Sequence, residues 1–213
     1  MRQTKYLVTG ALLLALCLTG FVNLACDLLF PAEDVKYEIP SYYTTYTDES
    51  QLFSISYPYY WRTPLGNVAE FQEYMKKSAG NLKTGIPLQN TSLLFFAGVD
   101  TTRGYDPLIV VAVEPAAAGV LTQRQMIESE LKRVKLEDPD FQVLSRVDTK
   151  VNGREATVLT WKEAGTRQGN LYVLEMLTLV DQNIWIVAGV TADATSKWDV
   201  DFNTIVRSLQ IHK

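Results

Sequence analysis

Consecutive β-strand patterns in the C-terminal half constrain the fold of this chain more than any other feature. Strands are expected at residues 141–151, 154–161, 170–180 and 184–191. Asn152 and Gly153 separate the first two strands and form the strongest short hairpin signal that a sequence can carry. Asp181 begins a similarly short connection between the last two. Strands joined by such short turns pair antiparallel, so the sequence predicts an antiparallel sheet.

The strand expected at residues 170–180 is apolar on both faces. Leu174 and Met176 point to one side, whereas Val173 and Leu177 point to the other. A strand of this kind needs cover on both faces of its sheet.

Helical periodicity provides candidates for that cover. Helices are expected at residues 67–78, 121–136 and 195–209, and further strands at 52–57, 92–98 and 108–114. Thr122 is the expected N-cap of the middle helix, whose buried stripe begins at Met126. The sequence therefore predicts an α+β fold, an antiparallel β-sheet covered by helices on both faces in a three-layer α/β/α sandwich.

The N-terminus has the pattern of an export signal. Arg2 and Lys5 precede a run without charge over residues 6–25, and acidic residues follow it. Positive charge before an apolar run and negative charge after it predict an N-terminus inside and a domain outside. Residues 1–26 are therefore expected to be a signal peptide or signal anchor that places the protein on the outer, extracytoplasmic face of a bacterial membrane.

Cys26 is the candidate lipid anchor. Ala25 precedes it, as in the bacterial lipoprotein motif, but Asn23 stands where that motif has leucine. Three outcomes stay open: lipidation at Cys26, an uncleaved anchor, and plain secretion. About 20 apolar residues suffice to span a bilayer, so the anchor is physically possible.

Residues 27–50 have the character of a linker that precedes a domain at 51–213. Pro31 and Pro40 interrupt this stretch, and tyrosines and threonines dominate residues 42–47. An extended spacer that holds the domain away from the membrane is the favoured interpretation. The alternative places these tyrosines at the lipid interface or against the domain.

Residue types that carry most catalytic and metal chemistry are scarce. The single histidine is His212, near the C-terminus, and both cysteines, Cys17 and Cys26, lie in the leader. The sequence therefore predicts no catalytic residue, no metal site and no cofactor, and hence a protein that is not an enzyme. With a net charge of −4 and no basic stripe, nucleic-acid binding is not expected. Acidic clusters at residues 137–140 and 193–201 are interpreted as loop and helix-start acids, with calcium ligation as the alternative.

Aromatic residues around the end of the first strand are the candidate binding surface. Tyr57, Tyr59, Tyr60 and Trp61 lie together in the sequence, and tyrosine and tryptophan are enriched in protein interfaces.

Glu175 is the remaining candidate, because it lies among apolar residues of an expected central strand. A charge there needs a partner or a wet groove. It is interpreted as one half of a salt bridge to an arginine on an adjacent strand, such as Arg154 or Arg146, and the alternative is an acid that binds a ligand.

Several segments together resemble PsbP-like domains. They are Phe53-Ser-Ile-Ser-Tyr-Pro58 followed by Trp61, Asn152-Gly-Arg-Glu-Ala156, Asn170-Leu-Tyr-Val-Leu-Glu175, and residues 184–191 and 205–211. The resemblance implies an antiparallel sheet between helices. It also implies binding of proteins or apolar ligands without shared catalytic residues, since the family includes a photosystem II subunit, a Ran-binding import factor and bacterial lipoproteins.

Two main hypotheses for function follow. The first is a membrane-tethered extracytoplasmic binding or scaffolding module with an envelope protein as partner, which needs an exposed aromatic surface. The alternative is a carrier of a small apolar ligand or lipid, which needs a buried dry cavity. A hydrolase built on carboxylates is a third, and it needs paired acids with shifted pKa values.

Overall fold

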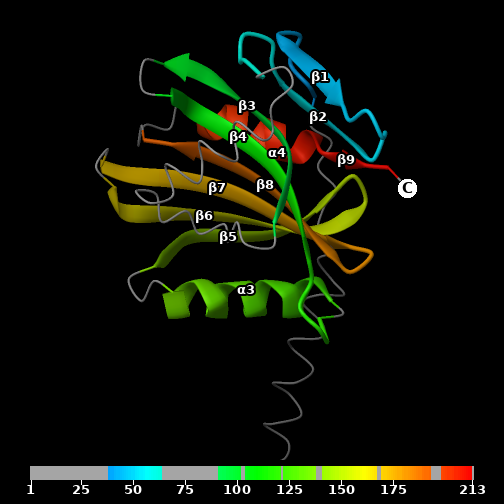
Figure 1. Ribbon diagram of the computed structural model, residues 1–213, viewed down its shortest axis with the longest axis vertical. Helices are drawn as coiled ribbons and strands as arrows, with labels where there is room; N and C mark the ends of the chain where they lie inside the picture. The colour runs from blue at the N-terminus through cyan, green and yellow to red at the C-terminus, as the bar shows by residue number, and fades with distance from the viewer. Residues whose placement is uncertain are drawn as a thin grey trace, which may run out of the picture. The chain divides into compact units, whose positions relative to one another are not determined.

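The computed structural model describes residues 38–63, 91–101, 104–120, 122–137, 141–166, 169–192 and 198–212, within a compact unit that spans Asp34–Lys213. Its elements are β1 (Tyr43–Thr47), β2 (Phe53–Pro58), β3 (Ser92–Thr101), β4 (Gly104–Pro115), α3 (Gln123–Glu137), β5 (Gln142–Val151), β6 (Arg154–Thr166), β7 (Gly169–Val180), β8 (Asn183–Thr191), α4 (Asp199–Ser208) and β9 (Gln210–Ile211) (Figure 1). The leader with Cys26, and the helix expected at residues 67–78, lie outside the described residues.

A six-stranded antiparallel sheet in the order β3-β4-β8-β7-β6-β5 forms the centre of the molecule. Asn152 and Gly153 join β5 to β6 with positive φ angles of 51° and 78°. Asp181 and Gln182 join β7 to β8 with φ angles of 50° and 61°. Two-residue turns with positive φ match the twist of antiparallel strands, and the expected hairpins are confirmed.

Strand β7 is covered on both faces, as its sequence predicts. Leu174 and Met176 belong to the core on the side of α4. Val173 and Leu177 belong to the core on the side of α3. The two apolar faces of one strand therefore connect two separate cores.

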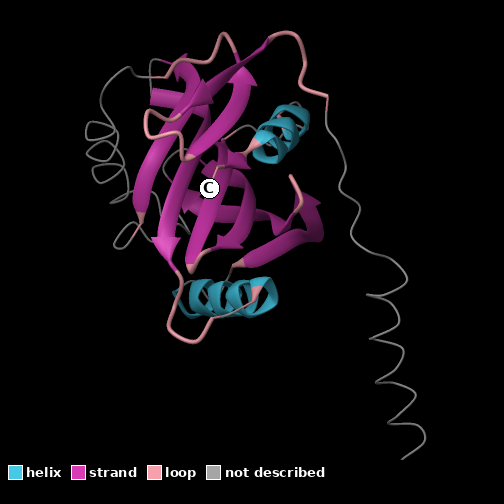
Figure 2. Ribbon diagram, turned by 90° about the vertical axis from the view of Figure 1, so that its right-hand side faces the viewer, coloured by secondary structure: helices cyan, strands magenta, loops and turns pink. Residues whose placement is uncertain are grey.

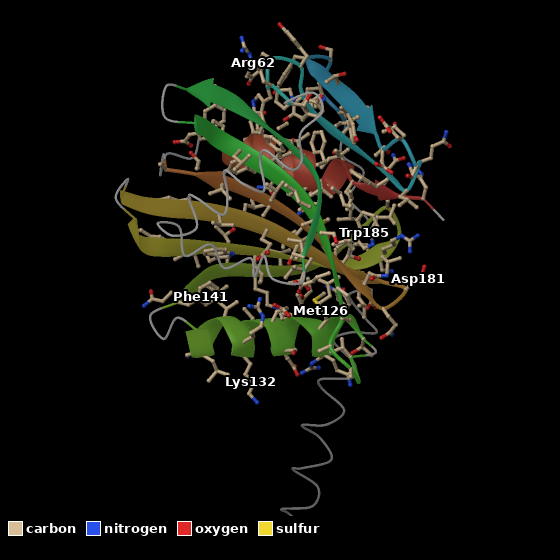
Figure 3. All side chains as sticks on the ribbon, in the orientation of Figure 1. Arg62, Met126, Lys132, Phe141, Asp181 and Trp185 are labelled. Carbon is tan, nitrogen blue, oxygen red and sulfur yellow. The ribbon has the colours of Figure 1, made fainter. Side chains whose placement is uncertain are left out.

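Helix α3 begins where the sequence places its cap. The Thr122 Oγ1 accepts a hydrogen bond from the Gln125 backbone N–H at 3.2 Å. Met126 and Ile127 are fully buried against the sheet, where α3 packs on β6 and β7. Figure 3 shows Met126 on the side of α3 that faces the strands and exposed Lys132 on the opposite side.

The expected three-layer α/β/α sandwich, with a layer of helices on both faces, is wrong, because a single described helix packs on each side of the central sheet. The described part of the chain is mostly antiparallel β-structure, and a second sheet in the order β1-β2-β9 shares with α4 the cover of one face. Helix α4 packs against β2, β7 and β8, and strands separate it from α3 in both views (Figure 1, Figure 2). A two-sided apolar strand requires apolar cover, which a sheet supplies as well as a helix does.

Strand β1 lies inside the range 27–50 that the sequence assigns to a linker. It pairs antiparallel with β2 over Tyr43–Thr47. Tyr43 and Tyr46 pack against the core, and the Tyr46 ring stacks on Phe95 at 4.6 Å between centroids. The alternating tyrosines and threonines thus suit a half-buried strand, in agreement with the alternative that these tyrosines pack on the domain.

Candidate functional site

Three tyrosines form an exposed aromatic surface beside the β1–β2 sheet. Tyr59 is 69% exposed and Tyr60 is 50% exposed, and their rings meet edge to face at 5.9 Å. Tyr42 joins them from the residues before β1, because its carbonyl oxygen accepts the Tyr59 backbone N–H at 2.9 Å. We call Tyr42, Tyr59 and Tyr60 the tyrosine surface.

Backbone hydrogen bonds hold the tyrosine surface on a firm scaffold. The Trp61 N–H donates to the Pro58 carbonyl at 3.0 Å and closes a turn whose tip is Tyr59 and Tyr60. Just after that turn, Arg62 and Gly98 of β3 exchange two backbone bonds of 2.8 and 3.1 Å. Exposed rings on such a scaffold lose little conformational freedom when a partner binds.

The other two aromatic candidates lie in the core. Tyr57 is buried, with its ring 5.4 Å from that of Phe95. Trp61 is buried against Phe202 of α4, with 6.3 Å between the centroids of the two rings. The turn after Pro58 separates the group, because it exposes the residues at its tip and returns the next side chain to the interior.

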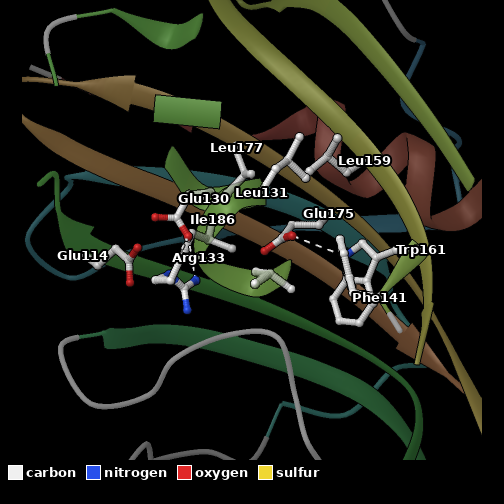
Figure 4. Close-up of a pocket in the computed structure, with 11 residues that line it drawn as sticks. Glu114, Glu130, Leu131, Arg133, Phe141, Leu159, Trp161, Glu175, Leu177 and Ile186 are labelled. Atoms are coloured by element: carbon white, nitrogen blue, oxygen red, sulfur yellow. Dashed lines mark hydrogen bonds and ion pairs between the residues drawn. The ribbon is translucent and has the colours of Figure 1, made fainter. Parts of the chain in front are cut away.

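Glu175 lies far from the tyrosine surface, in a small pocket between α3 and the six-stranded sheet (Figure 4). The cavity holds about 20 Å³, which is room for about one water molecule. Three carboxylates and an arginine meet there with apolar and aromatic side chains. The lining residues are Glu114, Glu130, Leu131, Arg133, Val134, Phe141, Leu159, Trp161, Glu175, Leu177 and Ile186.

The predicted salt bridge between Glu175 and Arg154 or Arg146 is absent from the described contacts. The Glu175 Oε2 instead accepts a hydrogen bond from the Trp161 Nε1 at 3.4 Å. Arg146 pairs with Asp148 at 3.0 Å, and Arg154 donates to a backbone carbonyl 3.4 Å away. Arg154 lies opposite Val151 on the face of the sheet that packs toward α4, away from Glu175. Arg146 shares the face of Glu175 but lies two strands away, because Leu159 stands between them in the register.

Two pocket carboxyl groups have raised pKa values. Burial raises the pKa of Glu175 to about 7, although the hydrogen bond from Trp161 opposes the shift. Burial also raises the pKa of Glu114, whereas a hydrogen bond from the Thr91 hydroxyl at 3.0 Å lowers it. Paired acids with raised pKa values are what a carboxylate hydrolase needs. A cavity of this size, however, leaves no room for a substrate between them.

The sequence did not predict the part that Tyr42 has in the tyrosine surface or the part that Glu114 has in the pocket. Tyr42 falls within the range expected to be a linker, and the hydrogen bond that its carbonyl accepts from Tyr59 joins it to the surface. Glu114 follows an apolar run in β4 and is buried. The available signal is an acidic residue at the end of an apolar strand, which resembles the position of Glu175 among apolar residues of its strand.

Other expectations concern metals and membranes. Among the described residues, no group of three or more histidine, cysteine or acidic side chains is placed to hold a metal ion. Asp138, Asp140 and Asp193 of the acidic clusters lie outside those residues.

His212 has a ring nitrogen 3.3 Å from the Ser54 hydroxyl. In the described part of the chain, no helix has the length and apolar character to span a bilayer.

Comparison with solved structures supports the family resemblance. The chain is similar to cyanobacterial PsbP (CyanoP) from Synechocystis sp. PCC 6803, with a TM-score of 0.50 and 13% identity over 86% of this chain and 100% of that one. The described domain has the PsbP-like fold. The expected PsbP-like recognition is thus confirmed at the level of fold.

Weaker structural similarities extend to two further proteins. The PsbP-like domain matches PA94 of Pseudomonas aeruginosa, a protein of unknown function described as a putative regulator, with a TM-score of 0.47 and 13% identity over 81% of this chain and 99% of that one. It matches the Saccharomyces cerevisiae Ran-binding protein Mog1p with a TM-score of 0.46 and 7% identity over 79% and 95%. No protein-family model and no curated protein matches the sequence.

Proposed function

We propose that this chain is a non-catalytic binding or scaffolding module, tethered by its N-terminus to the outer face of a bacterial membrane. Its PsbP-like domain presents the tyrosine surface to an envelope protein. The observation that carries the proposal is the exposure of Tyr59 and Tyr60 on a hydrogen-bonded turn. Tyrosines are common among the few residues that supply most of the binding energy at interfaces.

The tether in this proposal rests on the leader. Arg2 and Lys5, the uncharged stretch 6–25 and the acids that follow support export with the domain outside. Anchorage confines the search for a partner to the membrane plane and raises the effective concentration. Intact-mass analysis of the mature protein tests the form of the anchor. A lipid-modified Cys26 is expected, and an unmodified start at Met1 would contradict lipidation.

The carrier alternative receives no support from the described cavity. Small-molecule sites usually enclose about 300–1,000 Å³. The pocket under α3 has about 20 Å³ and contains the carboxyl groups of Glu114 and Glu175. It is therefore too small for an apolar ligand.

Site-specific photo-cross-linking tests the binding surface. A photoreactive amino acid at Tyr60 of the full-length chain, expressed in a bacterial envelope, should yield one adduct of defined mass with an envelope protein. The control position is Leu136, which is exposed on α3. Tyr59→Ala should reduce the adduct at position 60 about tenfold or more, because a hot-spot residue contributes on the order of 2 kcal/mol.

Three results would contradict this surface. They are equal adducts at positions 60 and 136, an adduct that Tyr59→Ala leaves unchanged, and labelling of lipid alone. The Tyr59→Ala protein should unfold at the same temperature as the parent, since the side chain is exposed and its backbone bonds remain.

A further inference from the structure

Strand β5 is an open edge of the six-stranded sheet. In the described part of the chain it pairs with β6 alone, so the backbone groups of its outer edge have no neighbouring strand. All residues from 142 to 148 are exposed. Val143, Leu144 and Val147 are apolar, with Val147 at 47% exposure. A long exposed edge with apolar side chains is a site for pairing with another strand.

The sequence of this edge is complementary to itself. It reads Ser145-Arg-Val-Asp-Thr149, with Val147 at its centre. In an antiparallel pair of two such strands centred on Val147, Arg146 lies opposite Asp148 of the second copy, and Ser145 lies opposite its Thr149. Opposite charges directly across antiparallel strands stabilise such a pair, whereas the Thr149 side chain is buried and takes no part in it.

Charge selects this register over its neighbours. Side chains paired across antiparallel strands share a face, so a two-fold symmetric pair is centred on a residue. Centring on Arg146 opposes two arginines, and centring on Asp148 opposes two aspartates. Like charges directly opposite each other destabilise a sheet. Centring on Ser145 instead places Arg146 opposite apolar Leu144 and leaves it without a charge across the strand.

Contacts within the chain position the charged groups of Arg146 and Asp148 at the edge of β5. The Arg146 Nη2 lies 3.0 Å from the Asp148 Oδ2, and both side chains keep partial exposure. The Thr157 hydroxyl of β6 donates to the Asp148 Oδ1 at 2.7 Å. Both charged side chains therefore lie on one face of β5, where a second copy can reach them.

We propose that two copies of this chain pair edge to edge through β5, with Val147 on the two-fold axis. A β-bulge between Val143 and Ser145 interrupts the regular register. Regular pairing is therefore limited to residues 145–149, and the contact is a weak one between membrane neighbours. The inference is independent of the tyrosine surface, which lies in the residues before β1 and in the turn after β2.

Charge reversal combined with photo-cross-linking tests the pairing. The full-length chain, carrying either of two epitope tags, is produced in a bacterial membrane with a photoreactive amino acid at Val147. An adduct between the two tags is expected, and peptide mapping should place its junction in β5 of both copies. Arg146→Asp alone and Asp148→Arg alone should each reduce it several-fold, because each opposes like charges.

Co-expression of the two single variants should restore the adduct, now joining one copy of each. The doubly exchanged variant, Arg146→Asp with Asp148→Arg, should also restore it and keeps an ion pair within each chain, which separates pairing from folding. Arg124→Glu is the control, since Arg124 forms an exposed pair with Glu128 at 3.0 Å on α3. Three results would overturn the proposal. They are the absence of an adduct between two copies, an adduct with another protein or with lipid instead, and an adduct whose yield the charge reversals leave unchanged.

Discussion

The ring of Phe202 lies directly over Gly189, where an added Cβ would come within 2.5 Å of two ring carbons. Phe202 belongs to α4 and Gly189 to β8, so the missing side chain lets the helix approach the sheet. Phe202 belongs to the buried core that connects α4 to the second sheet.

Replacing Gly189 by alanine should therefore destabilise the protein. A clash with a buried ring typically costs about 1–3 kcal/mol of the free energy of unfolding. Denaturant unfolding measures the loss. The penalty should shrink in a Phe202→Leu background, because the smaller side chain makes room for the methyl group. If the effects of the two changes on the free energy of unfolding are strictly additive, the contact between residue 189 and the Phe202 ring is not the cause of the loss.

Glu175 should make stability depend on pH. Burial raises the pKa of Glu175 to about 7 in the folded protein, whereas glutamate in an unfolded chain titrates near about 4.3. The folded state thus binds the proton more tightly. The stability that protonated Glu175 contributes to the folded state is fully present below about pH 4.3 and is lost as the pH rises through about 7.

Glu175→Gln should remove this loss. The variant should be more stable than the parent by about 1–3 kcal/mol at pH 8 and nearly equal to it at pH 4. Its amide oxygen can still accept the hydrogen bond from the Trp161 Nε1. Unfolding curves between pH 4 and pH 8 measure the difference, with exposed Glu155→Gln as the control. A gain that is equal at all pH values would contradict burial as the cause.

Asn152 should have two separable roles in the β5–β6 turn. It adopts a φ of 51°, and its Nδ2 donates to the Leu209 carbonyl at 2.6 Å, which connects the turn to the end of α4. Asn152→Gly should lose only the hydrogen bond, at a cost of about 1 kcal/mol. Asn152→Ala should cost about 1 kcal/mol more, because alanine disfavours positive φ. Thermal and denaturant unfolding of both variants should follow that order, and the reverse order would rule out the backbone role.

Tyr43 should connect the second sheet to α4 through its hydroxyl. The hydroxyl donates to the Asp201 Oδ1 at 2.7 Å. Tyr43→Phe should lower the free energy of unfolding by about 1–2 kcal/mol, since a hydrogen bond to a charged group is lost. Asp201→Asn keeps an acceptor oxygen and should cost less. A larger loss for Asp201→Asn than for Tyr43→Phe would mean that Asp201 stabilises α4 in another way.

The same contact predicts behaviour at high pH. Burial, followed by the hydrogen bond to Asp201, raises the pKa of Tyr43 above its usual value near 10. The unfolded chain therefore loses this proton first, and the stability contributed by Tyr43 falls as the pH rises above about 10. Ultraviolet titration of the tyrosines should show one fewer late-ionising group in Tyr43→Phe, and an unchanged titration would contradict it.

Local chemistry made the hairpins and α3 predictable. Asn152 and Gly153 tolerate the positive φ angles of a two-residue turn, and Thr122 supplies the cap where α3 begins. Such signals act over a few neighbouring residues, so the sequence alone carries them. The two apolar faces of β7 were likewise readable from the alternation of its side chains.

Contacts between distant segments were not predictable in this way. The tyrosines of β1 suit a spacer or a strand, and pairing with β2 decides between them. The Glu175 carboxylate had two arginines as plausible partners in the sequence, yet sheet register brought Trp161 to it. The run from Tyr57 to Trp61 divided between core and surface because a turn reverses its direction.

The sequence by itself determined the hairpins β5–β6 and β7–β8, because turn chemistry and alternation are local properties. It also determined that β7 needs cover on both faces. Only the tertiary structure decided that a second sheet joins α4 to cover one face, that the tyrosine surface gathers from two segments, and that β5 remains at an open edge. Each of these depends on which distant apolar surfaces exclude water together, and that pairing is a property of the whole fold.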